Sequence, residues 1–209
     1  MGRASDLVVV KLGGSYAFSA PLRLWLHALA GCAGRIVVVP GGGPFADVVR
    51  EAQPKMGFDD RAAHHMALLA MTQYGRAMAG LHEGFALVES AADILRVVAA
   101  RQVPVWSPVP MALESRDLPE SWEVTADSLA AWLARRLGAR SVLLVKQIRP
   151  PGDLAPAAEL VARGVVDPVL PRLLGAGGPE AYVVGPMDHA AAAAAIRERT
   201  VLGTRVAPG

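Results

Sequence analysis

The stretch VVVKLGGS, residues 8–15, decides the fold, and a second stretch of the same kind, VVVPGGGP, follows at residues 37–44. In each, a run of β-branched apolar residues without polar alternation leads directly into glycines. Such a run is typical of a parallel strand that is buried on both faces. We therefore predict two parallel strands, each with a glycine-rich turn at its carboxyl end.

The two turns have the chemistry of an anion site. Glycines accept positive φ and let backbone N–H groups approach an anion, and a helix that follows adds its positive N-terminus. The first turn alone is equally well explained as a tight turn with a solvated lysine. Three successive glycines in the second turn cost backbone entropy, which indicates close approach to a ligand. The residues concerned are Lys11, Gly13, Gly14, Ser15, Gly41, Gly42 and Gly43.

Two common phosphate motifs are absent. The sequence contains neither GxxxxGK[ST] nor a GxGxxG after a strand, so P-loop and dinucleotide-binding interpretations lose support. Lys11 lies two residues before Gly13, where its ammonium group can reach over the turn. One lysine and several backbone donors can supply much of the catalysis of phosphoryl transfer, which is mainly positioning and charge neutralisation. The pair of turns therefore predicts a polyphosphate held between them.

The composition is that of one globular domain. The chain has 209 residues, 53% of them hydrophobic, and no Ser/Gly/Pro linker divides it, so we expect a single domain over residues 1–209. No signal peptide or membrane span is recognisable, and we expect a cytoplasmic protein with no membrane partner. The formal net charge of +2 is spread along the chain, which argues against a nucleic-acid partner. The single cysteine, Cys32, excludes an internal disulfide.

Apolar runs and helical spacing alternate along the chain. Strands are expected at residues 7–10, 36–39, 85–88, 103–106, 109–113, 142–145, 182–184 and near 200–206. Helices are expected after Ser19, at residues 45–53, 61–81, 91–101 and 125–137, near 167–168, and from the alanine run to Arg197. We expect Pro54 to stop the second helix and residues 150–156 to form a loop. Alternating strands and helices predict an α/β sandwich around a mainly parallel sheet.

Two helices have features beyond their periodicity. Residues 61–81 are apolar almost all the way round, which indicates a central core helix or a subunit interface, and we expect a homo-oligomer. The helix at 125–137 opens with TADS, where Thr125 caps the helix and Asp127 lies in its first turn. Alternatively, Asp127 orients Lys11 or meets a magnesium-bound phosphate, and a carboxylate beside the lysine would keep the ammonium charged.

The motifs KLGGS, PGGGP and TADS, in this order, resemble the pattern of the amino acid kinase superfamily, which includes acetylglutamate, aspartate, uridylate and isopentenyl phosphate kinases. The stretches SWEVTADSLA (121–130), VDPVLPRLL (166–174) and AYVVGPMDHAA (181–191) are similar to one branch. That branch is the kinase of methanofuran-type cofactor biosynthesis, which converts an aminomethyl-furanylmethyl phosphate to its diphosphate. The resemblance implies a three-layer sandwich of the carbamate kinase type, with about eight strands.

The resemblance also implies site roles. Lys11 would bridge the transferred group and Asp127 would organise the site, with ATP and Mg²⁺ as cofactors and a small phosphorylated substrate. No protein residue is expected to bind a metal directly. Nucleotide contacts are expected from Gly13, Gly14, Ser15, Thr125, Lys146 and Asp167, the last of which is also explained as a helix cap before Pro168. Acceptor contacts are expected from Gly41, Gly42, Gly43, Arg61 and His64, while Trp122 either faces the acceptor ring or packs in the core.

The chain departs from the superfamily pattern in two places. Many members carry a TDVDG-like acidic segment where this chain reads LLVKQIRPPG, so that Lys146 stands in place of the acids and is expected to meet the ATP phosphates. A second catalytic lysine of several members has no counterpart, unless Arg172 reaches inward. Two alternatives therefore stay open: a non-catalytic nucleotide-binding or storage protein, and a kinase for uridylate or isopentenyl phosphate.

Overall fold

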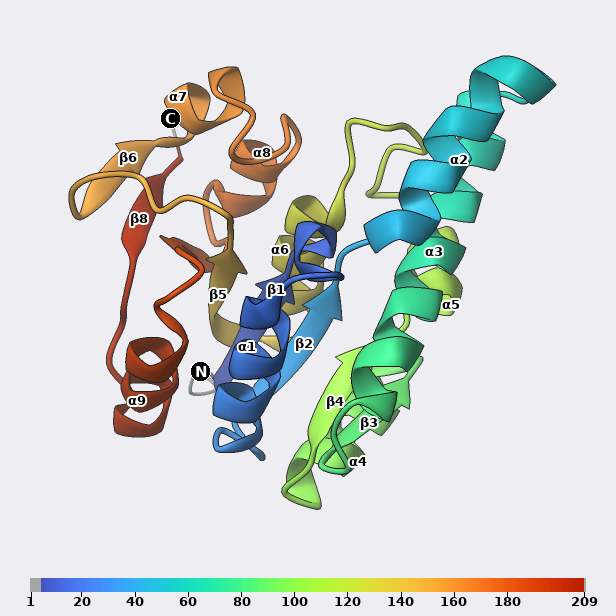
Figure 1. Ribbon diagram of the computed structural model, residues 1–209. Coiled ribbons are helices and arrows are strands. Elements are labelled where there is room, and N and C mark those ends of the chain that lie inside the picture. Colours follow the sequence, from blue (N-terminus) through green and yellow to red (C-terminus); the bar gives the residue numbers. More distant parts are fainter. Residues whose placement is uncertain (1–4, 209) are drawn as a thin grey trace.

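A computed structural model describes residues 5–208 of the protein as a sheet covered by helices on both faces (Figure 1). The described strands form one eight-stranded sheet in the order β3-β4-β2-β1-β5-β7-β8-β6. All neighbouring pairs are parallel except β7 and β8. The strands are β1 Ser5–Leu12, β2 Ile36–Pro40, β3 Phe85–Val88, β4 Val103–Trp106, β5 Ala139–Val145, β6 Leu154–Pro156, β7 Glu180–Val184 and β8 Thr204–Ala207. The predicted α/β sandwich with a mainly parallel sheet is confirmed.

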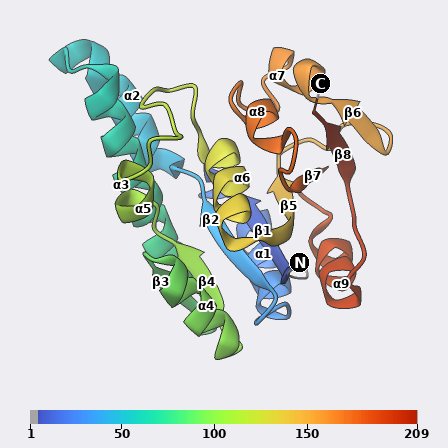
Figure 2. The same ribbon diagram turned by 180° about the vertical axis from the view of Figure 1, so that it is seen from behind.

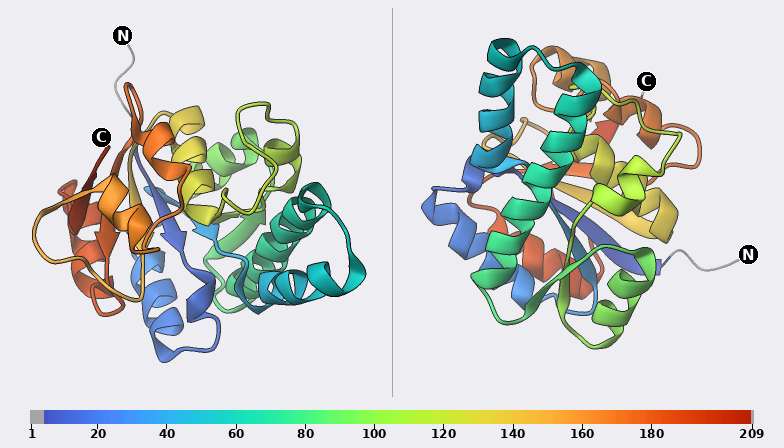
Figure 3. Two further views of the ribbon diagram at one scale, coloured as in Figure 1. Left: turned by 90° about the horizontal axis from the view of Figure 1, so that it is seen from above. Right: turned by 90° about the vertical axis from the view of Figure 1, so that its right-hand side faces the viewer.

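The helices form the other two layers, one on each face of the sheet, as the left-hand view of Figure 3, seen from above, shows. Side chains of α1 and α9 pack on one face, and those of α4, α6 and α8 pack on the other. Alternate residues of β1 supply both cores, because successive side chains of a strand point to opposite faces. The helices are η1 Gly14–Tyr16, α1 Ala20–Ala30, α2 Gly43–Met56, α3 Asp60–Gly80, α4 Ala91–Ala99, α5 Val109–Leu113, α6 Ala126–Leu137, α7 Ala157–Ala162, α8 Leu170–Leu174 and α9 His189–Glu198.

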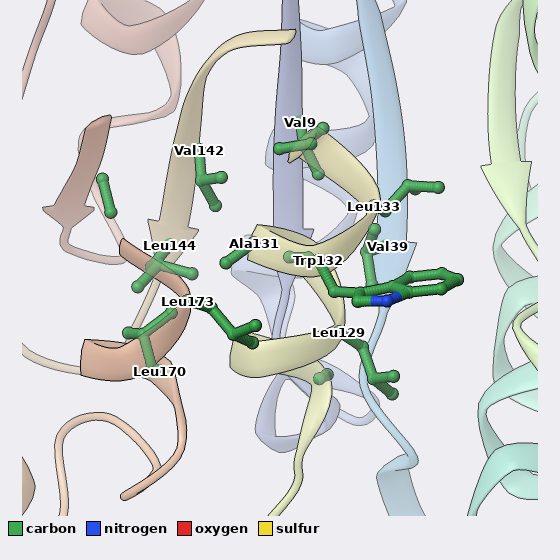
Figure 4. Packing of buried hydrophobic residues seen from close by; sticks show 14 of the residues in the cluster. Val9, Val39, Leu129, Ala131, Trp132, Leu133, Val142, Leu144, Leu170 and Leu173 are labelled. Atoms are coloured by element: carbon green, nitrogen blue, oxygen red, sulfur yellow. The ribbon is translucent and has the colours of Figure 1, made fainter. Parts of the chain in front are cut away.

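Helix α6 is the centre of the larger core. It crosses β1, β2 and β5 on the face seen from behind in Figure 2, and all its residues from 126 to 134 are buried. In Figure 4, its side chains Leu129, Trp132 and Leu133 lie among those of the strands and of α8. Burial on every side fixes the helix relative to the sheet, and with it the position of the residues in its first turn.

The two glycine turns lie against each other at the carboxyl ends of β1 and β2. The N–H of Gly41 donates to the carbonyl of Leu12 at 2.9 Å. A Cβ atom on Gly14 would lie 2.2 Å from the nitrogen of Gly43, and Gly43 itself has φ of 57°. The turns therefore require glycine because two main chains touch and because one residue adopts a left-handed conformation.

Several expected elements are wrong. Residues 109–113 form helix α5 rather than a strand, because a short apolar run fits either structure and Pro110 suits the first turn of a helix. Pro54 does not stop α2, which continues to Met56 and ends at Gly57 with a left-handed cap. Within the expected loop 150–156 lies strand β6, which pairs with β8. The short helix near 167–168 begins instead at Leu170.

The contact between the turns makes a prediction for stability. Gly14→Ala should lower the free energy of unfolding by about 1–3 kcal/mol, because the new methyl group must push two main chains apart. Gly80→Ala is the matched control: it lies in α3, and its added Cβ would meet nothing within 4 Å. Urea denaturation should show the control unchanged or slightly more stable. Equal stability of the two variants would contradict the close contact.

Candidate active site

A cavity of about 630 Å³ opens at the carboxyl ends of β1, β2 and β5. Its wall combines the two glycine turns, the first turn of α6, the end of β5 and the segment before α8. Ligand sites of parallel sheets are expected at this edge, because the following turns and helix N-termini gather there. Apart from Arg61 and His64, all the site residues predicted from the sequence line this cavity.

Three charged side chains meet inside the cavity. The Nζ atom of Lys11 lies 3.0 Å from Oδ1 of Asp127, and the Nζ atom of Lys146 pairs with Oδ2 of the same carboxylate. Lys11 belongs to β1, Lys146 directly follows β5, and Asp127 lies in the first turn of α6, which packs on both strands. Asp127 and Lys11 are buried and Lys146 is nearly so. Of the alternatives for Asp127, the contact with Lys11 is present in the structure, and Lys146 is a second partner that we did not predict.

The three charges shift one another's protonation. Burial by itself would raise the pKa of Asp127, but Lys11 and Lys146 outweigh it and hold the pKa below its usual range. Burial, together with the neighbouring Lys11, lowers the pKa of Lys146 to about 8, although Asp127 acts against them. With both lysines protonated, the cluster carries one net positive charge. It therefore favours an anion such as a phosphate group.

Asp167 holds the start of α6 in place. Its carboxylate accepts hydrogen bonds from the backbone and the hydroxyl of Thr125 at 3.0 and 2.8 Å, and from the backbone N–H and the hydroxyl of Ser128. It also accepts from the N–H groups of Val169 and Leu170 at 3.1 and 2.9 Å. Asp167 is therefore more than a local cap, because it ties the start of α8 to the N-terminus of α6. Thr125 caps α6, as predicted.

Two predicted acceptor residues lie outside the cavity. Arg61 is exposed and pairs with Glu120 at 2.8 Å. His64 is buried beside a smaller hollow that shares Gly42 and Arg50 with the cavity, and its Nδ1 lies 3.3 Å from the carbonyl oxygen of Ser121. Burial lowers the pKa of His64, so that the neutral ring predominates at neutral pH. A neutral imidazole brings no positive charge to a phosphate.

Trp122 and Arg172 both have contacts with other residues of the protein. The Trp122 indole donates to Gln53 at 2.7 Å and stacks under the Arg50 guanidinium, so its ring is already covered on one side. Arg172 does not reach inward, and donates instead to the carbonyl of Asp117 at 3.3 Å. The second cation beside Asp127 is Lys146.

Sequence reasoning missed four polar residues of the cavity wall. Asp47 and Arg50 come from the first turns of α2, Gln147 follows Lys146, and Arg163 precedes α8. Arg50 pairs with Asp47 at 3.0 Å. Arg50 lies seven residues after Gly43, which is two helical turns. This spacing puts Arg50 on the same side of the helix as the glycine turn, and it could have identified Arg50 from the sequence.

No metal site is formed by the side chains that the structure describes. Residues 5–208 contain no group of three His, Cys, Asp or Glu arranged to hold a metal ion. The two buried carboxylates of the cavity are engaged, Asp127 by lysines and Asp167 by hydrogen bonds. Neither of these two carboxylates is therefore free to bind a metal ion.

Asp167 allows a test of the support for α6. Asp167→Ala should lower the free energy of unfolding by about 3 kcal/mol or more, because several buried donors lose a charged acceptor. Asp59→Ala is the matched control, since its carboxylate caps α3 through one hydrogen bond from Ala62. A loss of about 1 kcal/mol is expected there. Urea denaturation yielding equal losses would refute the supporting role of Asp167.

Comparisons with known proteins show the family of this chain. The model of the amino acid kinase family matches residues 6–150. The [5-(aminomethyl)furan-3-yl]methyl phosphate kinase of Methanocaldococcus jannaschii is 29% identical over 191 residues, covering 84% of this chain and 86% of that protein.

Solved structures share the fold at low identity. Uridylate kinase from Archaeoglobus fulgidus has a TM-score of 0.72 at 18% identity and covers 96% of this chain and 100% of that chain. An isopentenyl phosphate kinase has a TM-score of 0.64 at 14% identity, with the same coverage of 96% and 100%. Fold, site geometry and family model lead to one conclusion: the chain belongs to the amino acid kinase family and is a phosphotransferase.

Proposed function

We propose that the protein transfers the γ-phosphoryl group of ATP to the phosphate group of a small acceptor, which gives a diphosphate. The acceptor that we propose is an aminomethyl-furanylmethyl phosphate, on the strength of the Methanocaldococcus jannaschii relative. The observation that carries the proposal is the buried Lys11–Asp127–Lys146 cluster beside two touching glycine turns. This arrangement provides fixed positive charge and backbone donors within one cavity.

The chemistry requires neutralisation more than acid–base catalysis. An oxygen of the acceptor phosphate forms the new bond to the γ-phosphorus, and the bond from that phosphorus to the β,γ-bridging oxygen breaks, so ADP leaves with the electron pair. The acceptor phosphate is ionised near neutral pH and needs no strong base. Lys11 and Lys146 would offset the negative charge that gathers between donor and acceptor, while Asp127 holds both ammonium groups in place.

We assign the first turn to the nucleotide and the second to the acceptor. Gly13, Gly14 and Ser15 would donate to the terminal phosphates of MgATP, which binds as the substrate complex. Gly42 and Gly43 open α2, whose N-terminus would hold the acceptor phosphate. Arg50 lies on the wall between the cavity and the smaller hollow, and we propose it in place of Arg61 as the side chain that meets the acceptor.

Oligomeric state and cellular location stay predictions from the sequence. Helix α3 exposes Met66 and Leu69, which supports the proposed contact with a second copy. Among the described helices, none combines the length and apolar character needed to cross a membrane.

A coupled assay of ADP release with ATP, Mg²⁺ and a set of phosphorylated acceptors tests the function. We expect turnover with the aminomethyl-furanylmethyl phosphate, and much less with uridylate, isopentenyl phosphate or ATP alone. Lys11→Ala should reduce turnover by at least 10²-fold with the fold intact, because one of two charge-neutralising groups is lost. Lys55→Ala is the control, since Lys55 is exposed on α2.

The outcomes separate the alternatives. Near-normal turnover by Lys11→Ala would contradict the proposed mechanism. Preference for uridylate or isopentenyl phosphate would keep the chemistry and replace the acceptor. Nucleotide binding without turnover for any acceptor would support a non-catalytic binding protein.

The pKa of Lys146 predicts a pH dependence. Because this pKa is about 8, Lys146 is protonated below pH 8 and loses its charge as the pH rises through that value. The ratio kcat/KM, which reports ionisation of the free enzyme, should therefore fall above pH 8. Lys146→Arg keeps the charge at every accessible pH and should remove this decline, whatever its effect on the maximal rate. Lys55→Arg is the control and should leave it in place. A decline that persists in Lys146→Arg would contradict the assignment.

A further inference from the structure

Tyr16 joins the first glycine turn to the end of β5. Its hydroxyl donates a hydrogen bond of 2.5 Å to the carbonyl oxygen of Lys146, 130 residues further along the chain. The side chain is fully buried within the core that includes β1 and α1. Tyr16 is the last residue of η1, the short helix that begins inside the turn. One buried side chain therefore connects the turn assigned to the nucleotide with the backbone of a lysine in the charged cluster.

The backbone of Lys146 needs such support. Lys146 is the first residue after β5, and the chain that follows it leaves the sheet through a segment containing Pro150, Pro151 and Gly152. Its N–H donates to the carbonyl of Val184 on β7 at 2.9 Å, which fixes one side of the residue. The Tyr16 hydroxyl fixes the other side. Without it, the carbonyl side of Lys146 would keep the contacts made by the neighbouring residue, Gln147.

Gln147, the residue after Lys146, makes a second connection between the first glycine turn and the end of β5, at the surface. The amide nitrogen of Gln147 donates to the carbonyl oxygen and to the hydroxyl oxygen of Ser15, each at 3.2 Å. Consecutive residues 15 and 16 thus contact consecutive residues 146 and 147. The Gln147 contacts are exposed and compete with water, whereas the Tyr16 contact is partly buried and comes from a side chain that is itself fully buried.

Tyr16 has the protonation state that this contact requires. Burial, and then the charge of Asp188, raises the pKa of the Tyr16 hydroxyl to about 12. The hydroxyl therefore keeps its proton throughout the range in which a kinase works, and it donates to the carbonyl at every such pH.

We propose that Tyr16 is a positioning residue, which holds the Lys146 backbone so that the ammonium group stays on Asp127 beside Lys11. It touches neither substrate in this assignment and acts through Lys146. The proposal rests on the proposed function for its kinetic consequence, but its structural consequence can be measured without any substrate.

The surroundings of Lys146 give the direction of that consequence. The charged groups that face its ammonium are Lys11 from β1 and Asp127 from α6. The remaining charges of the cavity wall are those of Asp47, Arg50, Arg163 and Asp167. Burial and Lys11 lower the pKa of Lys146, so a side chain released toward water and away from Lys11 regains a higher pKa.

Tyr16→Phe removes the hydroxyl and keeps the ring. The matched control is Tyr182→Phe, which loses a hydroxyl that donates to Glu180 at 2.9 Å on β7, away from the cavity. The chain has three lysines, Lys11, Lys55 and Lys146, so protein labelled with [13Cε]lysine gives few signals in an NMR titration. Lys55→Arg and Lys146→Arg assign them.

We expect the Lys146 titration to move upward by at least half a pH unit in Tyr16→Phe and to stay in place in Tyr182→Phe. With the acceptor of the coupled assay, kcat should fall about tenfold in Tyr16→Phe, with each KM within about twofold, because a positioning defect acts on the transferred group. An unchanged Lys146 titration in a folded Tyr16→Phe protein would overturn the proposal. A shifted titration in a protein without kinase activity would keep the positioning role and remove the proposed function instead.

Discussion

The site depends on one buried carboxylate shared by two ammonium groups. Asp127 is nearly inaccessible to water, and a lone charge there would be strongly unfavourable. Lys11 and Lys146 compensate it, and Asp127 in turn allows two like charges to lie close together. The compensation requires β1, the end of β5 and the first turn of α6 to meet at one point. The sheet order that places β1 beside β5, and the crossing of α6 over both, satisfy this requirement.

The two buried aspartates near the start of α6 have different partners. Asp127 faces the cavity and pairs with the ammonium groups of Lys11 and Lys146, which can also interact with a polyphosphate. Asp167 accepts hydrogen bonds from N–H and O–H groups of the protein, so it stabilises the start of α6. Replacing Asp127 should change the charge of the cavity, whereas replacing Asp167 should destabilise α6, the helix that carries Asp127.

The sequence predicts those parts of the site that depend on neighbouring residues. Glycine runs after buried strands identify the two turns, and Thr125 with Asp127 identifies the start of a helix. The sequence does not predict contacts between distant segments. Lys146 and Tyr16 meet their partners because β1 pairs with β5, and this pairing is known only from the fold. For Arg61 the sequence predicted a contact that the structure lacks. Arg61 lies one helical turn from His64 and was expected to meet the acceptor, but it is exposed and pairs with Glu120 from a distant loop. Residues 109–113 were misassigned because five apolar residues carry too little periodicity to separate a strand from a short helix.

The touching glycine turns have a consequence for how such a protein can change its substrate. Where the two turns meet, the approach is between main chains: an added Cβ on Gly14 or Gly41 would lie within 2.4 Å of a backbone nitrogen of the other turn. In the proposed assignment of the turns, substitutions in α2, α3 and the segment before α6 would reshape the hollow around the acceptor and leave the contact between the turns in place. Under the proposed function, acceptor choice and reaction geometry would be separable traits, and altering helix faces would introduce a new specificity.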